Sequence, residues 1–226
     1  MLARKLSEIK TRIRELEARY HREPQSVSLL AVSKGQSLEN IQEVLAAGQY
    51  QFGENYLQEA LLKMEALQHP QLEWHFIGTI QSNKTRPIAR FSWVHTVCDA
   101  KIAARLNDQR PPSWPPLNIC FEVNISHEPS KSGLTTLGEV IALARTCQSL
   151  PHLRLRGLMA IPAWRSSLAE QRAECRKLYD MQQALIQQGF ELDTLSIGMT
   201  EDMEAAIAEG STVVRVGKGI FGERPK

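Results

Sequence analysis

Lys34 is the residue whose type and position most clearly suggest binding or catalytic chemistry, because it directly follows a short apolar run that starts at Val27. Such a run is typical of a strand buried in a parallel sheet, and the ligand sites of α/β proteins lie just beyond the carboxyl ends of these strands. A lysine in that place can bind a phosphate or a carboxylate, or, where it is desolvated, act as an amine that forms an imine. An ordinary surface lysine at a strand end is the other interpretation, since most lysines are exposed.

Polar residues and glycines follow most of the other apolar runs in the same way. In chain order they are Gly53-Glu54-Asn55, His75 with Gly78 and Gln81–Lys84, Asn124 with Ser126 and Lys131–Gly133, and Gly157–Met159. If these runs are parallel strands of one sheet, their carboxyl ends meet at one face. We therefore expect these residues to gather around Lys34.

The last two apolar runs are followed by the most specific pattern. Ser196, Gly198 and Thr200 precede an acidic first helical turn, and Arg215 precedes Gly217-Lys218-Gly219. Barrels often bind phosphate after their seventh and eighth strands, through hydroxyls and the backbone amides of helix starts and glycines. Taken singly, Thr200 could be a helix cap and the glycines could merely end the sheet. Together with Arg215 and Lys34, the pattern favours a ligand that carries a phosphate.

The elements that must position these residues alternate regularly along the chain. Hydrophobic periodicity predicts eight strands, at about residues 27–33, 50–53, 73–78, 93–97, 117–124, 153–158, 194–197 and 212–216. Helices are predicted in all seven gaps, at about residues 37–47, 54–67, 83–89, 100–107, 137–149, 168–188 and 201–209. An additional amphipathic helix is predicted at residues 2–20, where Leu2, Leu6, Ile9, Ile13, Leu16 and Tyr20 form one apolar stripe.

This alternation predicts an α/β fold with a parallel sheet. Eight strands in a chain of 226 residues fit a single (β/α)₈ TIM-type barrel with an extra N-terminal helix. An open doubly wound sheet is the alternative, but no G-x-G-x-x-G pattern follows the first strand to support it. We expect residues 1–226 to form one domain.

Composition excludes several other classes of protein. A hydrophobic content of 42%, a charged content of 23% and a net charge of +2 are ordinary for a globular protein and give no sign of nucleic-acid or membrane binding. The four cysteines form no C-x-x-C pair and no cluster with histidines, so we expect neither a metal site nor a disulfide framework. Scattered single thiols, the absence of a long apolar run and a charged N-terminus together predict a cytoplasmic protein.

Pyridoxal 5′-phosphate (PLP) combines the two groups that these residues would bind. Its aldehyde would meet Lys34, and its phosphate would meet the loops after the seventh and eighth strands. Because the eighth and first strands adjoin in a closed barrel, one small cofactor can contact both. Arg215 lies two residues before Gly217, so its side chain can meet the pyridine nitrogen. A cation there keeps that nitrogen unprotonated and makes the ring a weaker electron sink.

With these residues assembled, the chain closely resembles the pyridoxal phosphate homeostasis protein family from about Leu29 to Arg224. The motifs that carry the resemblance are Ala31–Lys34, Phe52–Tyr56, Trp74–Gly78, Gln81–Lys84, Val123–Ser126, Lys131–Gly133, Arg156–Met159, Leu195–Met199, Asp202–Ile207, Val214–Gly217 and Ile220–Arg224. The resemblance implies a barrel like the N-terminal domain of alanine racemase, which is fold type III among PLP proteins.

The resemblance also implies roles around the cofactor ring. Lys34 would hold PLP as an internal Schiff base, and Asn55 would lie beside the ring. Met159 would pack near the ring, and Arg215 would face its nitrogen. His75 would line the same site, either as a catalytic histidine or as a histidine in the core behind the cofactor.

The phosphate would be bound, by the same resemblance, by Ser196, Thr200, Gly217 and the backbone amide of Lys218. Two positions depart from the family pattern. Gly35 stands where the family usually has threonine, which removes a hydroxyl and loosens the loop. Lys218 stands where the family usually has threonine or serine; its ammonium could reach the phosphate or point to solvent.

Two functions from different classes fit these residues. The resemblance implies a non-catalytic PLP-binding protein that acts in intracellular vitamin B6 homeostasis, supplies PLP-dependent apo-enzymes and is a monomer or weak dimer. The alternative is a PLP-dependent amino-acid racemase or a related fold-type III enzyme, which needs a base on each face of its substrate. Related racemases take the second base from a C-terminal domain for which we expect no room after Gly222, so His75 or Tyr56 would have to replace it.

Overall fold

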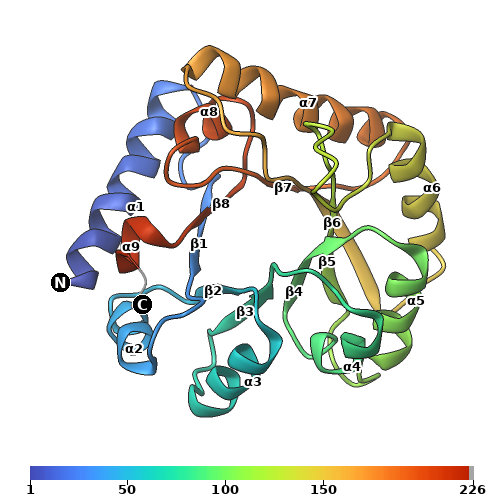
Figure 1. The fold of residues 1–226 in the computed structure, drawn as a ribbon, viewed down its shortest axis with the longest axis horizontal. Helices are drawn as coiled ribbons and strands as arrows, with labels where there is room; N and C mark the ends of the chain where they lie inside the picture. The colour runs from blue at the N-terminus through green and yellow to red at the C-terminus, as the bar shows by residue number, and fades with distance from the viewer. Residues whose placement is uncertain (224–226) are drawn as a thin grey trace.

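Eight parallel strands close into a barrel in the order β1-β2-β3-β4-β5-β6-β7-β8 (Figure 1). The computed structural model describes residues 1–223, so Arg224 of the last family motif and the terminal residues 225–226 lie outside the described part. The strands are β1 Ser28–Val32, β2 Gln51–Glu54, β3 Glu73–Phe76, β4 Trp93–Val97, β5 Leu117–Glu122, β6 Leu153–Met159, β7 Thr194–Ser196 and β8 Val213–Val216. The predicted (β/α)₈ barrel is confirmed, and the open doubly wound sheet is excluded.

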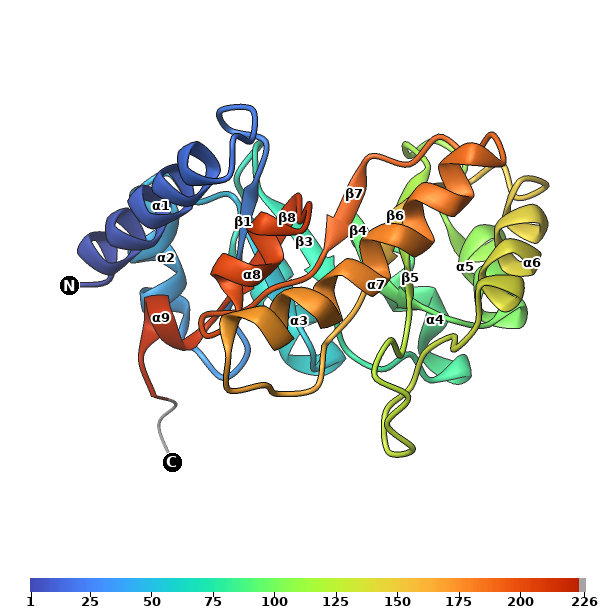
Figure 2. The ribbon, with the colours of Figure 1, turned by 90° about the horizontal axis from the view of Figure 1, so that it is seen from above.

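Helices follow the strands and surround the barrel (Figures 1 and 2). They are α1 Leu2–Arg19, α2 Leu38–Ala46, α3 Leu57–Ala66, the 3₁₀ turn η1 Ser82–Lys84, α4 Thr85–Ile88, α5 Ala100–Gln109, α6 Leu137–Cys147, α7 Leu168–Gln187, α8 Met203–Ala208 and α9 Lys218–Phe221. The short α9 was not predicted, because the glycines on both sides of Lys218 indicate a loop.

Local sequence explains where several helices begin. Thr136 caps α6 and Ser167 caps α7, and in each case a glutamate three residues later completes a capping box. The helix predicted from residue 54 begins only at Leu57, because Glu54 is the last residue of β2. Side-chain caps therefore place the starts of the long helices, and the sheet determines the start of α3.

Helix α1 covers the place where the first and last strands meet. It packs against α2, α8 and α9 through a stripe that includes the buried Leu6, Ile13 and Leu16. Arg19 and Tyr20 at its end both contact the carboxylate of Glu204 on α8, at 2.8 and 2.9 Å. The predicted N-terminal helix thus belongs to the barrel wall.

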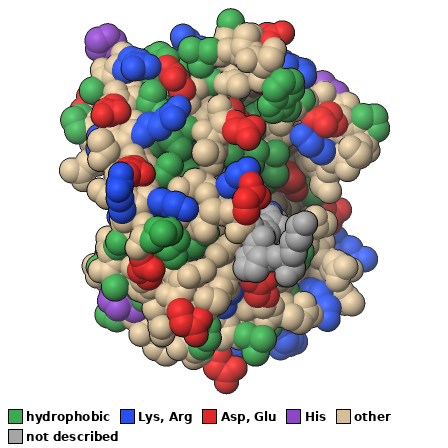
Figure 3. Space-filling view, turned by 60° about the vertical axis from the view of Figure 1, so that its left-hand side comes forward, with side chains coloured by type: hydrophobic (Ala, Val, Ile, Leu, Met, Phe, Trp, Pro, Cys, Tyr) green, Lys and Arg blue, Asp and Glu red, His purple; other side chains and the backbone are tan. Residues whose placement is uncertain are grey.

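On the face that Figure 3 shows, basic and acidic side chains are interspersed.

The barrel interior is more polar than the layer between strands and helices. The outer layer is a continuous apolar core. Inside the barrel, His75, His95, Ser196 and Arg215 are all buried and hydrogen-bonded to one another in sequence. Buried polar groups are costly unless they are paired, so this interior chain demands an explanation.

Three absences hold for residues 1–223. None of the described helices is long and apolar enough to cross a membrane. The cysteines at 98, 120, 147 and 175 are unbonded. Histidine, cysteine and carboxylate side chains form no metal-binding group in this part of the chain.

Candidate functional site

Lys34 lies in a tight turn directly after β1, at the C-terminal mouth of the barrel. The turn is closed by a hydrogen bond from the Gln36 amide to the Ser33 carbonyl at 3.0 Å. Lys34 is half-buried, and Gly35 after it has a φ of +71°. This left-handed conformation favours glycine, so the departure at Gly35 suits the turn that this chain forms.

An ionic cluster of the buried Glu54 and Lys63 and the partly exposed Glu59, hereafter the Lys63 cluster, holds this turn from both sides. The Lys63 ammonium donates to the Ser33 carbonyl at 2.7 Å, to Glu54 at 2.7 Å and to Glu59 at 2.5 Å. Glu54 also accepts from the Ser33 hydroxyl at 2.6 Å, and Glu59 from the Gly35 amide at 2.6 Å. The residues on either side of Lys34 are therefore fixed to α3 and β2.

Electrostatics make this cluster sensitive to its cation. Glu54 is fully buried, and burial raises the pKa of its carboxyl while the hydrogen bonds from Lys63 and Ser33 lower it. Lys63 itself is 5% exposed. A buried charge pair of this kind loses its balance if one partner is removed.

The loops after β7 and β8 adjoin the end of β1, as the predicted phosphate site requires. A Cβ atom on Gly217 would lie 3.2 Å from the Val32 carbonyl, and one on Gly219 would lie 3.4 Å from the methyl carbon of Thr200. Because Gly217 caps α9, the first amides of that helix have no acceptor within it. Thr200, Gly217 and the Lys218 amide thus meet near the turn of Lys34.

The Lys218 side chain points away from this place. It is 70% exposed and pairs with Glu223 at 2.5 Å. The structure therefore favours the second of the two interpretations of Lys218, in which its side chain points to solvent.

Ser196 and Arg215 lie inside the barrel, below the mouth. The Arg215 guanidinium donates to the Ser196 carbonyl at 2.6 Å, to the Ser196 hydroxyl at 2.8 Å and to the Ala160 carbonyl at 2.8 Å. Burial lowers the pKa of Arg215 to about 10, which leaves it charged at neutral pH. The Ser196 hydroxyl is thus engaged with Arg215, which adds a role that the predicted phosphate contact did not include.

The remaining predicted residues occupy three different positions. Asn55 follows β2, and its Oδ1 atom is buried with no hydrogen-bond partner among residues 1–223. Met159 ends β6, is 1% exposed and lies level with Ser196 on β7. His75 is 3% exposed, stacks on Trp93 and contacts His95, so it lies in the core beneath the mouth.

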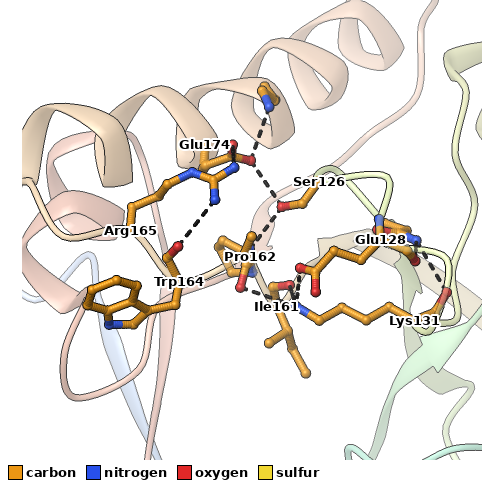
Figure 4. A network of polar contacts seen from close by, with 11 residues as sticks. Ser126, Glu128, Lys131, Ile161, Pro162, Trp164, Arg165 and Glu174 are labelled. Atoms are coloured by element: carbon orange, nitrogen blue, oxygen red, sulfur yellow. Dashed lines mark hydrogen bonds and ion pairs between the residues drawn. The ribbon is translucent and has the colours of Figure 1, made fainter.

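The loops after β5 and β6 are tied together at the same mouth (Figure 4). The Lys131 ammonium donates to the carbonyl groups of Ile161 and Pro162 at 3.2 and 3.4 Å, and pairs with Glu128 at 2.6 Å. Ser126 joins the same two loops, because its hydroxyl accepts from the Ala163 amide at 2.9 Å. The motif Lys131–Gly133 therefore has a structural role in this loop pair.

Besides Glu59 and Lys63, sequence reasoning missed two residues near the site. His95 is fully buried between His75 and Ser196, and Glu122 is a half-buried carboxyl at the end of β5 whose pKa burial raises. Strand alternation was a signal for His95, because it lies two residues after the inward-facing Trp93. Glu122 stands level with Met159 in the sheet, so the position of Met159 could have pointed to it.

A closed barrel with its polar residues at the carboxyl ends of the strands belongs to the class of (β/α)₈ proteins that bind a small ligand there. Comparison with known proteins identifies one family within this class. Residues 5–225 match the family model of the alanine racemase N-terminal domain. The pyridoxal phosphate homeostasis protein of Pseudomonas aeruginosa is 50% identical over 224 residues, which are 99% of this chain and 96% of that protein.

A second curated relative and a solved structure point to the same family as the first relative. The pyridoxal phosphate homeostasis protein of Escherichia coli is 48% identical over 227 residues, 99% of this chain and 97% of that one. The structure of PipY from Synechococcus elongatus with PLP bound superposes with a TM-score of 0.85 at 33% identity, covering 98% of this chain and 100% of PipY. The chain therefore belongs to the pyridoxal phosphate homeostasis proteins, within the alanine racemase N-terminal domain family, and the resemblance stated from its motifs is confirmed.

Proposed function

We propose that this protein binds PLP at the mouth of its barrel, holds it as a Schiff base on Lys34 and acts in PLP homeostasis without catalysing a reaction of its own. The names of its relatives and the PLP bound in PipY support the ligand. The observation that carries the proposal is the parallel pairing of β1 with β8, which brings the Lys34 turn beside Gly217 and Arg215.

The residues present fit this cofactor. The Oδ1 atom of Asn55 is a buried acceptor without a partner among residues 1–223. Asn55 directly follows β2, the strand that pairs with β1 and so lies next to the Lys34 turn. Gly217 leaves open a space in which a Cβ atom would approach the Val32 carbonyl to 3.2 Å. When bound, PLP would supply an aldehyde for an amine and a dianionic phosphate for backbone amides.

This chain's own residues would then divide the work. Lys34 supplies the amine, and the Lys63 cluster orients its turn. Thr200, Gly217 and the amide of Lys218 receive the phosphate. Arg215 presents its guanidinium to the ring nitrogen and prevents a proton from residing there.

The same geometry supports a carrier over a racemase. Racemisation needs a base on each face of the substrate. The nitrogen Nδ1 of His75 is occupied by His95 inside the core, and Tyr56 is 55% exposed at the start of α3. Neither supplies a second base inside the mouth, and Arg215 opposes the protonated ring that carbanion chemistry favours.

The proposal extends to surroundings and partners. Unbonded cysteines in the described chain suit the reducing cytoplasm. A homeostasis protein that binds an aldehyde reversibly would pass it to PLP-dependent apo-enzymes, and we propose a monomer or weak dimer as its working form.

The decisive experiment follows the imine itself. The full-length protein is mixed with PLP, its absorption spectrum is recorded, and the adduct is reduced with borohydride and mapped by peptide mass spectrometry. The label should lie on Lys34, disappear in Lys34→Ala and persist in Lys218→Ala, the matched lysine control. Label on another lysine, or no imine band, would overturn the Schiff-base assignment. Turnover of D- or L-amino acids that is lost in Lys34→Ala would instead establish the enzyme.

A further inference from the structure

A chain of buried side chains crosses the barrel interior from Arg215 to Glu73. Arg215 Nη1 lies 2.8 Å from Ser196 Oγ, Ser196 Oγ lies 2.9 Å from His95 Nδ1, and His95 Nε2 lies 2.9 Å from His75 Nδ1. His75 Nε2 then faces Glu73 Oε2 at 3.7 Å. The two rings, the serine and the arginine are at most 5% exposed, whereas the Glu73 side chain is 43% exposed at the start of β3.

The two ends of this chain have fixed hydrogen-bonding roles. Arg215 can only donate, so Ser196 Oγ must accept from it. The facing His75 ring holds the pKa of Glu73 below its usual range, so Glu73 is a carboxylate that can only accept. Burial lowers the pKa of His75 and lowers that of His95 further, so each ring is neutral and carries one N–H.

Two proton arrangements satisfy the contact between the rings, and they differ in quality. In the first, His95 Nε2–H donates to His75 Nδ1, the Ser196 hydroxyl donates to His95 Nδ1, and His75 Nε2–H points at Glu73. In the second, every direction is reversed. The bare His75 Nε2 then faces a carboxylate, and the Ser196 proton has no acceptor among the described residues. The first arrangement gives each N–H and O–H an acceptor or a facing carboxylate, so it prevails.

We propose that His95 and His75 are positioning residues for Arg215, which act through Ser196 in a hydrogen-bond chain that runs in one direction from the guanidinium to His75. Beyond His75 the chain has no further hydrogen bond within residues 1–223, because the Nε2 atom of His75 faces the Glu73 carboxylate at 3.7 Å. That the guanidinium so held is the group presented to the cofactor's ring nitrogen rests on the proposed function. The chain supplies acceptors for Arg215 without placing a carboxylate against it: its three hydrogen bonds within residues 1–223 go to two carbonyls and one hydroxyl. Arg215 is therefore free of a hydrogen-bonded carboxylate within residues 1–223, and Asp202 and Glu122 act on its charge only through longer-range electrostatics.

The proposal predicts which nitrogen of each histidine carries the proton, and ligand-free protein suffices to check it. In the full-length protein labelled with ¹⁵N-histidine, two neutral rings protonated at Nε2 should be observed and assigned to 75 and 95. In protein labelled with ¹⁵N-arginine, the Nη protons of Arg215 should give separate signals, because hydrogen bonds slow the rotation of its guanidinium group. A ring protonated at Nδ1, or an imidazolium at neutral pH, at either position would overturn the proposal.

Two substitutions at His95 separate positioning from packing. His95→Asn keeps an oxygen near the Nδ1 position that can accept from Ser196, but it is smaller and leaves an amide in the core. His95→Phe fills the space and removes both hydrogen bonds. Positioning predicts that Asn retains the Arg215 signals with PLP affinity within about 3-fold of wild type, and that Phe loses both, with affinity weaker by about 10-fold.

A purely structural role predicts the opposite order, because a small buried amide whose N–H groups lack acceptors destabilises more than a well-fitting ring. Val94→Ala is the matched control, since Val94 is a fully buried neighbour on the same strand that takes no part in the chain. It should lower stability and leave the Arg215 signals and PLP affinity unchanged. Arg215 signals that survive in His95→Phe, or that are lost in Val94→Ala, would overturn the proposal. Failure of wild-type protein to bind PLP would refute the proposed function, while the ligand-free signals would still decide on positioning.

Discussion

Removal of the Lys63 ammonium is the perturbation that most directly tests how the Lys34 turn is held. In Lys63→Met the side chain keeps a similar length but loses hydrogen bonds to Ser33, Glu54 and Glu59. Glu54 is fully buried and would remain without its cation. The Ser33 carbonyl and the Glu59 carboxylate would also lose the Lys63 ammonium that links the turn to α3.

The expected cost follows from the burial of this pair. Breaking a buried ion pair by removing one partner typically destabilises a protein by about 3–5 kcal/mol, because it leaves a buried charge uncompensated. For a chain of 226 residues, about 3 kcal/mol corresponds to a fall of about 10 °C in melting temperature. The surface control Lys177→Met, whose lysine is 50% exposed and pairs with Glu174, should cost less than about 1 kcal/mol.

The pH dependence gives the prediction a sign. Burial raises the pKa of Glu54 in the folded state, so its favourable contribution is present below its unfolded pKa of about 4.3 and is lost as the pH rises through the folded pKa. Loss of Lys63 raises this folded pKa further. The stability deficit of Lys63→Met relative to wild type should therefore be larger at pH 8 than at pH 5.

Urea denaturation of the full-length protein at the two pH values measures these effects. The double variant Lys63→Met/Glu54→Gln removes the buried charge while keeping an acceptor for the Ser33 hydroxyl, so it should recover part of the loss at pH 8. A deficit below about 1 kcal/mol at pH 8, or one that does not depend on pH, would refute the argument that the Lys63 cluster is a buried, charged clamp.

Three further predictions concern single positions at the mouth. Gly35→Ala should destabilise the protein by about 1 kcal/mol in urea titration, because the φ of +71° strains a residue with a Cβ; equal stability would refute the left-handed turn. Gly78→Ala would place a Cβ atom 2.1 Å from the Asn55 carbonyl, so the β3 loop must shift, with a cost of about 1–3 kcal/mol and weaker PLP binding in a titration of imine absorbance. Lys218→Ala should change PLP affinity by less than about 2-fold, since its ammonium pairs with Glu223; a larger loss would mean that the side chain turns to the phosphate.

The sequence was informative wherever periodicity decides the structure. Strand alternation and the closed order of a barrel were sufficient to place Lys34 and Gly217 at one mouth and Arg215 on the adjoining strand, because β1 must then pair with β8. Sequence reasoning placed Ser196 at the end of the seventh strand as a phosphate ligand. It could not tell that the hydroxyl would bond to Arg215 and His95 inside the barrel.

Contacts between distant parts of the chain were beyond that reasoning. Lys63 reaches the Ser33 carbonyl from 30 residues away, and a lysine on a helix is ordinarily assigned to the surface. The contact between His95 and Ser196 spans 101 residues and joins strands that are not neighbours in the sheet. Such pairings depend on the width of the barrel interior, which no local pattern in the chain encodes.

The pairing of β1 with β8 also has a consequence for how this protein folds during its synthesis. Arg215 is synthesised long after Lys34, yet Leu30 and Arg215 stand opposite each other in the finished sheet. On the ribosome, one edge of β1 therefore stays unpaired until β8 has emerged, and an unpaired strand edge favours aggregation. A ligand that contacts both strands binds only the closed barrel and stabilises it by mass action. If PLP contacts both strands as proposed, its supply in the cell would also influence how much of this protein completes its folding.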